Sequence, residues 1–386
     1  MMSASLQPTP WPGLPWLTAA EMAAVRAQPG GDDELLKMFE AREQLVALAK
    51  AEPLEYGHEI QPGWPEARRQ LQGGCRDLLI MGGCRDLLIM GGRRSGKTEF
   101  AAKLAIERLL AKPGAEIQCW SQNETTSVDR QQTYLCRYLP GWMRKIKKTN
   151  HETRGLIKVS YSRATGFSDR VLVAGHNSVA RCFTYQSYRN DPTIAEGAEL
   201  DFCWLDEMAP VSVVNTLRFC RVARGGTLVQ TFTPEQGYTD TVAEYLNAAT
   251  VEQWRRAELL PDVRVWNGPR GEMPYVIQSF QRTRKVVFFF TADNPFPPGN
   301  YARLKEQLAG AHQDTIMRRA YGWPTKRVGA AFPRFGAANI VPHARALAVP
   351  GTNWLFLDPA GRKSPFMVWL RVDALGHVYA YREWPG

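Results

Sequence analysis

A short loop near the end of the first quarter of the chain constrains the fold more than any other feature. It reads Gly91-Gly92-Arg93-Arg94-Ser95-Gly96-Lys97-Thr98 and fits the phosphate-binding pattern GxxxxGK followed by Ser or Thr. Residues 86–90 before it form an apolar run, and residues 98–111 after it carry apolar side chains at helical spacing. The pattern therefore stands between a buried parallel strand and a helix, where such a loop can hold phosphate groups.

The residue types in this loop suit a nucleoside triphosphate bound with Mg²⁺. Glycines allow backbone N–H groups to turn towards phosphate oxygens, and the start of the following helix adds a partial positive charge. We expect Gly91 to Thr98 to bind ATP, with Lys97 on the outer phosphates and Thr98 as a ligand of Mg²⁺. A Gly-rich turn that binds nothing is the alternative.

A second apolar run, residues 200–205, leads into the adjacent carboxylates Asp206 and Glu207. At the end of a strand, Asp206 would hold Mg²⁺, and Glu207 would orient and deprotonate the attacking water. The adjacent glutamate favours hydrolysis over transfer of the phosphoryl group to a metabolite, because a kinase must exclude water. An ordinary acidic turn is the alternative.

Further expected strands alternate with helical segments, which predicts a doubly wound, mainly parallel α/β sheet. The strand after the acidic pair, residues 226–231, continues into Phe232-Thr233-Pro234. We expect Thr233 to sense the γ-phosphate, with Thr231 as the second choice and a plain turn as the alternative. The other expected strands are residues 116–120, 155–161, 170–174 and 179–185, and the expected helices are residues 33–50 and 121–138.

Composition limits the class of protein. A chain of 386 residues allows two or three domains. Its formal net charge of +10, from 48 basic and 38 acidic residues, favours a polyanionic partner. The seven cysteines include no CxxC pair, which favours reduced thiols over disulfides or zinc. No signal-peptide pattern and no long apolar run occur, so we expect neither secretion nor a membrane span.

Residues 73–81 and 82–90 are identical copies of GGCRDLLIM. Only the second copy leads into the phosphate-binding loop. The first could be a looped-out insertion, an added edge strand or a duplication. We favour a duplication without function, because so short a repeat cannot form its own core.

Taken in order, these features resemble the large terminase subunits of tailed bacteriophages, over about residues 60–386. The shared features are GGRRSGKT, RNDPTIAEG at 189–197, the acidic pair, TFTP at 231–234, TADNP at 291–295 and RRAYGWP at 318–324. The resemblance implies an ATP-driven motor that moves double-stranded DNA into a procapsid, joined to a nuclease that cuts concatemers. It also implies a location in the host cytoplasm, with no membrane association. The portal protein and the small terminase subunit would be partners, and the chain would form a homo-oligomeric ring on the procapsid.

In that family an arginine of the loop acts near the γ-phosphate. Of Arg93 and Arg94 we favour Arg94 as this catalytic residue, with a basic surface as the alternative. The family's pattern also places adenine recognition near Gln61, Trp64 and Gln70, although Trp64 could equally be a packing residue.

The helical pattern at 33–50 predicts a helical N-terminal region at 1–60. The resemblance implies a P-loop ATPase domain at 61–330 and a truncated nuclease domain at 331–386. A linker segment begins at about 290. Residues 353–361 form an expected strand that carries Asp358, and residues 365–372 and 377–384 form two more, joined by a turn at 373–376. This is how an RNase H-like α/β fold begins. Asp358 would be a catalytic residue, as the first ligand of a two-metal site for Mg²⁺ or Mn²⁺. Such a site needs further carboxylates, for which Glu383 is a candidate, so we expect little or no cutting by this chain.

The sequence leaves the DNA-contacting residues and the exact activity open. The densest basic runs, residues 144–148 and 282–285, could meet DNA phosphates or form a solvated basic face. Two other functions stay open: a helicase-like translocase or repair ATPase, and a non-catalytic binding or assembly protein.

Overall fold

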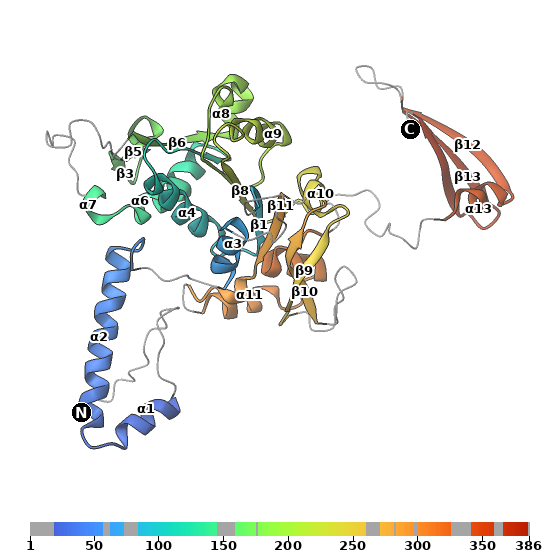
Figure 1. Cartoon of the computed structure of the whole chain (residues 1–386). Coiled ribbons are helices and arrows are strands. Elements are labelled where there is room, and N and C mark those ends of the chain that lie inside the picture. Colours follow the sequence, from blue (N-terminus) through green and yellow to red (C-terminus); the bar gives the residue numbers. More distant parts are fainter. Residues whose placement is uncertain are drawn as a thin grey trace, which may run out of the picture. The chain divides into compact units, whose positions relative to one another are not determined.

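The computed structural model describes residues 19–56, 62–72, 84–144, 159–174, 177–259, 271–281, 283–296, 299–325, 341–358 and 366–384. The chain divides into two compact units, Met1–Val328 and Gly329–Gly386 (Figure 1). The helical N-terminal segment belongs to the first unit and forms no unit of its own. The first copy of the repeat, residues 73–81, lies outside the described residues, and the second copy supplies the central strand β1.

A nine-stranded mixed sheet forms the centre of the first unit, in the order β5-β6-β2-β7-β8-β1-β11-β10-β9 (Figure 1). The six strands from β6 to β11 in that order are parallel, and β5, β10 and β9 are each antiparallel to their inner neighbour. The mainly parallel α/β prediction is therefore confirmed. The strands are β1 Asp86–Gly91, β2 Glu116–Ser121, β5 Val171–Ala174, β6 Ser178–Thr184, β7 Phe202–Asp206, β8 Thr227–Phe232, β9 Thr250–Arg256, β10 Glu272–Gln278 and β11 Arg284–Phe289.

Helices cover both faces of this sheet. One apolar core includes side chains of α3, α4 and α6, and a second includes side chains of α8 and α9. Every residue of β1 is buried as a result, as expected for an apolar strand at the centre of a parallel sheet. The helices are α1 Ala19–Arg26, α2 Gly31–Ala51, α3 Gly63–Gln72, α4 Lys97–Ala111, α5 Glu124–Thr126, α6 Thr133–Tyr138, α7 Gly141–Arg144, α8 Tyr185–Asn190, α9 Val211–Cys220, α10 Asp240–Leu246, α11 Asn300–Leu308 and α12 Gln313–Ile316.

The continuous helix predicted for residues 121–138 is wrong in its start and its regularity. Asn123 caps the helix by accepting a hydrogen bond from the Thr126 N–H at 2.9 Å, so the helix begins at Glu124. A π-helical segment, η1 Ser127–Gln132, then separates α5 from α6. Within η1, the Gln132 Oε1 accepts the Phe167 N–H at 2.7 Å and so joins the helix to a neighbouring hairpin.

That hairpin pairs β3 Tyr161–Ser162 with β4 Gly166–Phe167 and is followed by the 3₁₀ turn η3 Ser168–Arg170. The strand predicted at 155–161 lies mostly outside the described residues. The first unit also contains two 3₁₀ segments, η4 Pro192–Ala195 and η5 Thr291–Asp293, and the π-helical segment η6 Met317–Tyr321.

The second unit is a three-stranded antiparallel sheet with one helix, α13 His343–Ala348. Its strands are β12 Gly351–Asp358, β13 Phe366–Asp373 and β14 Val378–Trp384, with β13 in the middle. The turn predicted at 373–376 is present: the Asp373 carboxylate accepts the N–H groups of Leu375 and His377, both at 2.9 Å. Asp358 is the last residue of β12, and Glu383 belongs to β14 on the other side of β13.

Among the described helices, none is both long and apolar enough to cross a lipid bilayer.

Candidate nucleotide site

The phosphate-binding loop joins β1 to α4, and its glycines are required by close packing. A Cβ atom on Gly91 would lie 2.6 Å from the Phe289 carbonyl oxygen of β11. On Gly92 it would lie 2.2 Å from the Thr291 hydroxyl oxygen. Gly96, the N-cap of α4, has a φ of 86°. A side chain at any of these positions would clash or be strained, so the loop keeps its backbone close to the neighbouring segments.

Lys97 is held at this loop by oxygen atoms from two elements. Its Nζ donates hydrogen bonds to the carbonyls of Gly91 at 3.1 Å and Gly92 at 2.8 Å, and to the Thr233 hydroxyl at 3.0 Å. Thr233 in turn donates to the Gly91 carbonyl at 2.9 Å. Burial lowers the pKa of Lys97 to about 8, against the opposing effect of the carboxylates of Glu207 and Asp206.

Asp206 ends β7 and faces the start of α4. Its Oδ1 accepts hydrogen bonds from the Thr98 hydroxyl at 3.1 Å and the Thr231 hydroxyl at 2.7 Å. The side chain is buried, and burial raises the pKa of Asp206 to about 7. The nearby Glu207 acts in the same direction, whereas the two hydroxyls and Lys97 act against it.

Glu207 adopts a backbone conformation that is rare for a residue with a side chain. Its φ is 63°, and its N–H donates to the Thr231 carbonyl at 2.8 Å. The Tyr185 hydroxyl also fixes this turn by donating to the Asp206 carbonyl at 2.9 Å. The Glu207 carboxylate stays 40% exposed, with Arg130 of η1 at 4.0 Å. The strand tip therefore presents one buried carboxylate and one accessible carboxylate side by side.

Strand order explains why these residues meet. β8 lies between β1 and β7, so Thr231 and Thr233 at its end stand between the loop and the acidic pair. The structure thus brings Lys97, Thr98 and Asp206 of the predicted site together. Asp358 belongs to the other compact unit.

The two loop arginines differ in their surroundings. Arg93 forms an ion pair with Glu235, with its Nε 2.7 Å from Oε1, and its N–H donates to the Arg319 carbonyl at 2.8 Å. Arg94 has a φ of 56°, and its carbonyl accepts the Asn294 side-chain amide at 2.6 Å. Its guanidinium has no hydrogen bond or ion pair within the part of the chain that the structure describes. Of the two side chains, that of Arg94 is the one available to a phosphate group.

Sequence reasoning missed the residues that support the loop from outside. The Thr291 hydroxyl donates to the Arg93 carbonyl at 2.8 Å, and Asn294 and Arg319 bind the loop backbone as described above. These residues lie in the TADNP and RRAYGWP segments, which the sequence analysis noted as shared family features but not as contacts of the loop. Glu235 follows TFTP directly and carried no signal of its own.

The donor atoms at the site fit Mg²⁺. The Thr98 hydroxyl and the Asp206 carboxylate converge on one point, and Mg²⁺ is usually held by one or two such oxygens together with water and phosphate groups. No group of three or more His, Cys, Asp or Glu side chains suited to a metal occurs among the described residues. Thr98 and Asp206 would hold a Mg²⁺ ion whose other ligands are water and phosphate oxygens.

A family model decides which proteins this chain is related to. The model described as "Terminase large subunit, T4likevirus-type, N-terminal" matches residues 88–337, well over half of the chain. The chain belongs to the terminase large subunit family. The matched residues include the phosphate-binding loop, the acidic pair and the segments that support the loop.

Solved terminase structures are similar to the chain at low sequence identity. The large terminase of a thermophilic bacteriophage gives a TM-score of 0.47 at 15% identity and covers 85% of this chain and 68% of that chain. The complex of that terminase with ADP gives 0.45 at 13%, with 84% and 68% covered. The HK97 bacteriophage large terminase gives 0.44 at 12%, with 88% and 67% covered. Comparison with curated protein sequences finds no significant match. Structural similarity at these TM-scores gives no information on the roles of single residues.

For this terminase chain, the structure decides between adenine recognition and packing as the role of Trp64. Trp64 is fully buried and packs on Phe100, with ring centroids 5.6 Å apart, so it is a packing residue. Gln70 is also buried, and its amide donates to Glu66 at 2.5 Å. Neither side chain is available to an adenine base, and Gln61 lies outside the described residues.

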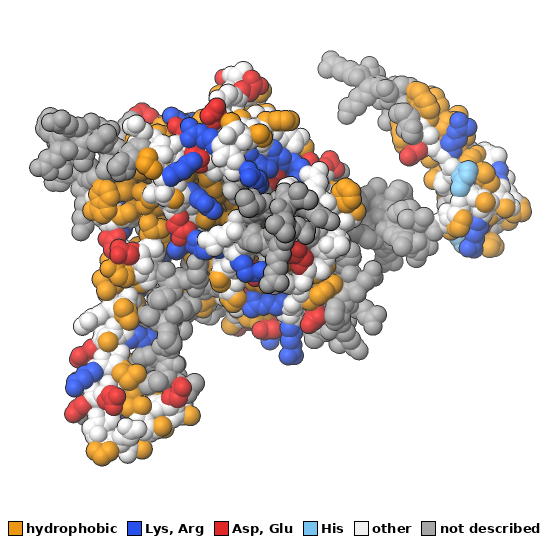
Figure 2. All heavy atoms as spheres, in the orientation of Figure 1, with side chains coloured by type: hydrophobic (Ala, Val, Ile, Leu, Met, Phe, Trp, Pro, Cys, Tyr) orange, Lys and Arg blue, Asp and Glu red, His pale blue; other side chains and the backbone are white. Residues whose placement is uncertain are grey.

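The predicted basic runs are mostly engaged or outside the described residues. Arg284 pairs with Asp86 and Glu244, and Lys285 pairs with Glu252. Residues 145–148 and Arg282 are not among the described residues. Figure 2 shows Lys and Arg side chains interspersed with acidic ones on the visible face of the first unit, not gathered into one patch.

Proposed function

We propose that this chain is the ATP-hydrolysing motor subunit that moves double-stranded viral DNA into a procapsid. The observation that carries this proposal is the contact between Thr98, at the start of α4, and Asp206, at the end of β7. Two elements far apart in sequence meet there with the hydroxyl and carboxylate that a Mg²⁺-dependent hydrolase of nucleoside triphosphates needs. Family membership supplies the DNA-packaging context.

Each residue of the site has a role in this proposal. Residues 91–98 cradle the phosphates, and Lys97 exchanges its carbonyl partners for the outer phosphate oxygens. The Mg²⁺ bound with ATP supplies charge neutralisation at the phosphates. Thr98 and Asp206 hold that ion, and the accessible Glu207 carboxylate accepts a proton from the attacking water.

Arg94 and Thr233 complete the site. The guanidinium of Arg94, which has no partner among the described residues, stabilises charge on the transferring phosphoryl group. The Thr233 hydroxyl accepts a hydrogen bond from the Lys97 Nζ, and it would respond to the γ-phosphate through this contact.

The wider assembly is also part of the proposal. The partners are double-stranded DNA, the portal protein and the small terminase subunit, with a homo-oligomeric ring on the procapsid in the host cytoplasm. Residues 331–386 would belong to an RNase H-like nuclease domain, in which Asp358 would hold Mg²⁺ or Mn²⁺.

Steady-state ATPase assays with and without duplex DNA test the proposal. We expect hydrolysis that duplex DNA stimulates without strand separation, whereas a helicase-like enzyme would unwind. Glu207→Gln should lower kcat by about 10²- to 10⁴-fold while nucleotide binding remains, because only proton transfer is removed. Lys97→Ala should lose hydrolysis as well. Glu43→Gln, at an exposed position of α2, is the matched control and should retain full activity. Normal hydrolysis by the Glu207 variant would show that the base is misassigned.

A further inference from the structure

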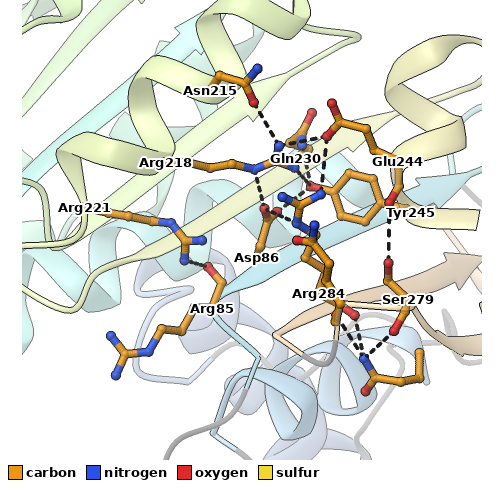
Figure 3. Close-up of polar contacts among 12 residues, drawn as sticks. Arg85, Asp86, Asn215, Arg218, Arg221, Gln230, Glu244, Tyr245, Ser279 and Arg284 are labelled. Carbon is orange, nitrogen blue, oxygen red and sulfur yellow. Dashed lines mark hydrogen bonds and ion pairs between the residues drawn. The ribbon is translucent and has the colours of Figure 1, made fainter.

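A buried charge cluster surrounds Asp86 at the start of β1, at the opposite end of that strand from the nucleotide loop (Figure 3). Asp86 is fully buried and accepts hydrogen bonds from the Arg218 Nε at 2.7 Å and from the Tyr245 hydroxyl. The Arg284 Nε lies 3.7 Å from the same carboxylate. Glu244 pairs with both arginines, at 2.8 Å and 3.4 Å. Two carboxylates therefore neutralise two guanidiniums.

The neighbouring cations at this end of the sheet are also paired. Lys112 and Arg224 share Asp201, at 2.5 Å and 3.0 Å. Lys285 pairs with Glu252 at 2.9 Å. The carboxylates of the described residues near the start of β1 are thus already occupied.

Beside this cluster, Arg85 and Arg221 have no carboxylate partner among the described residues. Arg221 follows α9, and its NH1 donates to the carbonyls of Arg85 and of Gly226, the latter at 3.4 Å. Its Nε is buried and has no hydrogen-bond partner within the described part of the chain. The Arg85 side chain is exposed, and in Figure 3 its guanidinium extends away from the Asp86 cluster, with no interaction drawn to it. Burial and the nearby Arg218 and Arg85 lower the pKa of Arg221, although Asp86 and Tyr245 oppose them.

We propose that Arg85 and Arg221 bind backbone phosphates of duplex DNA. The planar guanidinium presents several N–H donors in a fork that matches phosphate oxygens, and such contacts hold DNA without reading its sequence. A motor that moves along any DNA requires contacts of this kind. The inference rests on the proposed function, because that function makes duplex DNA the polyanion the chain meets.

The connections of Arg221 link this surface to the nucleotide site. α9 begins at Val211, shortly after Glu207, and ends at Cys220. β8 begins at Thr227 and runs back to the hydroxyl pair at its other end. The turn that carries Arg221 is therefore tied at both ends to elements that reach the nucleotide. A change at the acidic pair can be transmitted through one helix and one strand to the proposed DNA contact.

Fluorescence anisotropy with a duplex of arbitrary sequence, between 50 and 200 mM salt, tests this surface. Arg85→Gln is the decisive variant, because the Arg85 side chain is exposed and forms no hydrogen bond or ion pair with the described residues. Losing one phosphate contact should weaken binding about eight-fold at 0.1 M salt and reduce the log–log salt slope by about 0.9. Arg221→Lys should also weaken binding, because it keeps the charge and loses the fork. Arg163→Gln, in the exposed turn between β3 and β4, removes an equal charge and should bind like the unaltered protein.

The outcomes separate this surface from the proposed function. Equal affinity and slope for the Arg85 variant and the unaltered protein would overturn the inference, while DNA-stimulated hydrolysis by the unaltered protein would leave the function intact. A change in self-association at unchanged DNA affinity would assign the surface to a protein contact and also overturn it. Absence of both hydrolysis and duplex binding in the unaltered protein would overturn the function and the inference together.

Discussion

Replacing Asp86 by Asn should destabilise the first unit strongly. Asp86 is the only fully buried carboxylate of its cluster, and the side chains of its partners Arg218 and Arg284 are only 11% and 16% exposed. The substitution keeps the shape but leaves the cluster with two guanidiniums and only Glu244 to balance them. Removing one partner of a buried ion pair typically costs about 3–5 kcal/mol of unfolding free energy.

Thermal and urea unfolding measure this cost. For a unit of roughly 300 residues, an unfolding entropy of about 2 cal/mol/K per residue converts 3–5 kcal/mol into a fall in Tm of about 5–8 °C. The double variant Asp86→Asn/Arg284→Gln restores neutrality, so it should recover at least about 1 kcal/mol relative to the sum of the two single variants. A cost below about 1 kcal/mol for Asp86→Asn, or strict additivity in the cycle, would refute the assignment of the cluster as a buried ionic network.

Two further predictions concern the nucleotide site and the segment that supports it. Thr233→Val removes the hydroxyl that Lys97 contacts, so kcat for ATP should fall about ten-fold, which corresponds to the loss of one hydrogen bond to a charged group. Thr233→Ser keeps the hydroxyl and should keep most of the activity. A similar loss of activity in both variants would contradict this prediction. Burial raises the pKa of Asp293 to about 6, against the opposing charge of Arg255, so the folded state binds this proton more tightly than the unfolded state. Between pH 5 and pH 7, the unfolding free energy of the unaltered protein should therefore fall by about 1.3 kcal/mol more than that of the Asp293→Asn variant. Chemical unfolding of both proteins at the two pH values measures this difference. Equal pH dependence of the two proteins would show that the carboxyl group titrates normally.

The parts of the fold that could be predicted have local signatures. The apolar run before the glycine-rich loop, the helical spacing after it and the apolar runs of β7 and β8 each carry their information within a few residues. Sequence reasoning missed β9, β10 and β11. The apolar residues 286–290 are typical of a strand and could have predicted β11, but the preceding Arg284 and Lys285 were interpreted as part of a basic run. Their charges prove to be paired across the sheet, which a linear pattern does not reveal.

The residues of the nucleotide site also divide into those that the sequence predicts and those that it does not. Lys97 and Thr98 were predicted from the fixed spacing of the phosphate-binding pattern, and Asp206 from its place at the end of an apolar run. Glu235 and Asn294 have no such spacing: they reach the loop only because β8 and β11 flank β1. Contacts that depend on strand order become predictable only after the order is known.

The position of β11 beside β1 has a consequence for biosynthesis. β1 pairs in parallel with a strand that lies about 200 residues further along the chain. At about 5–20 residues per second, the ribosome adds that strand roughly 10–40 s after β1 has been made. Until then, one hydrogen-bonding edge of the apolar strand that carries the glycine-rich loop has no permanent neighbour, and it is open to wrong pairing. Newly made chains should therefore depend on chaperones over this interval, and slower translation should lengthen it.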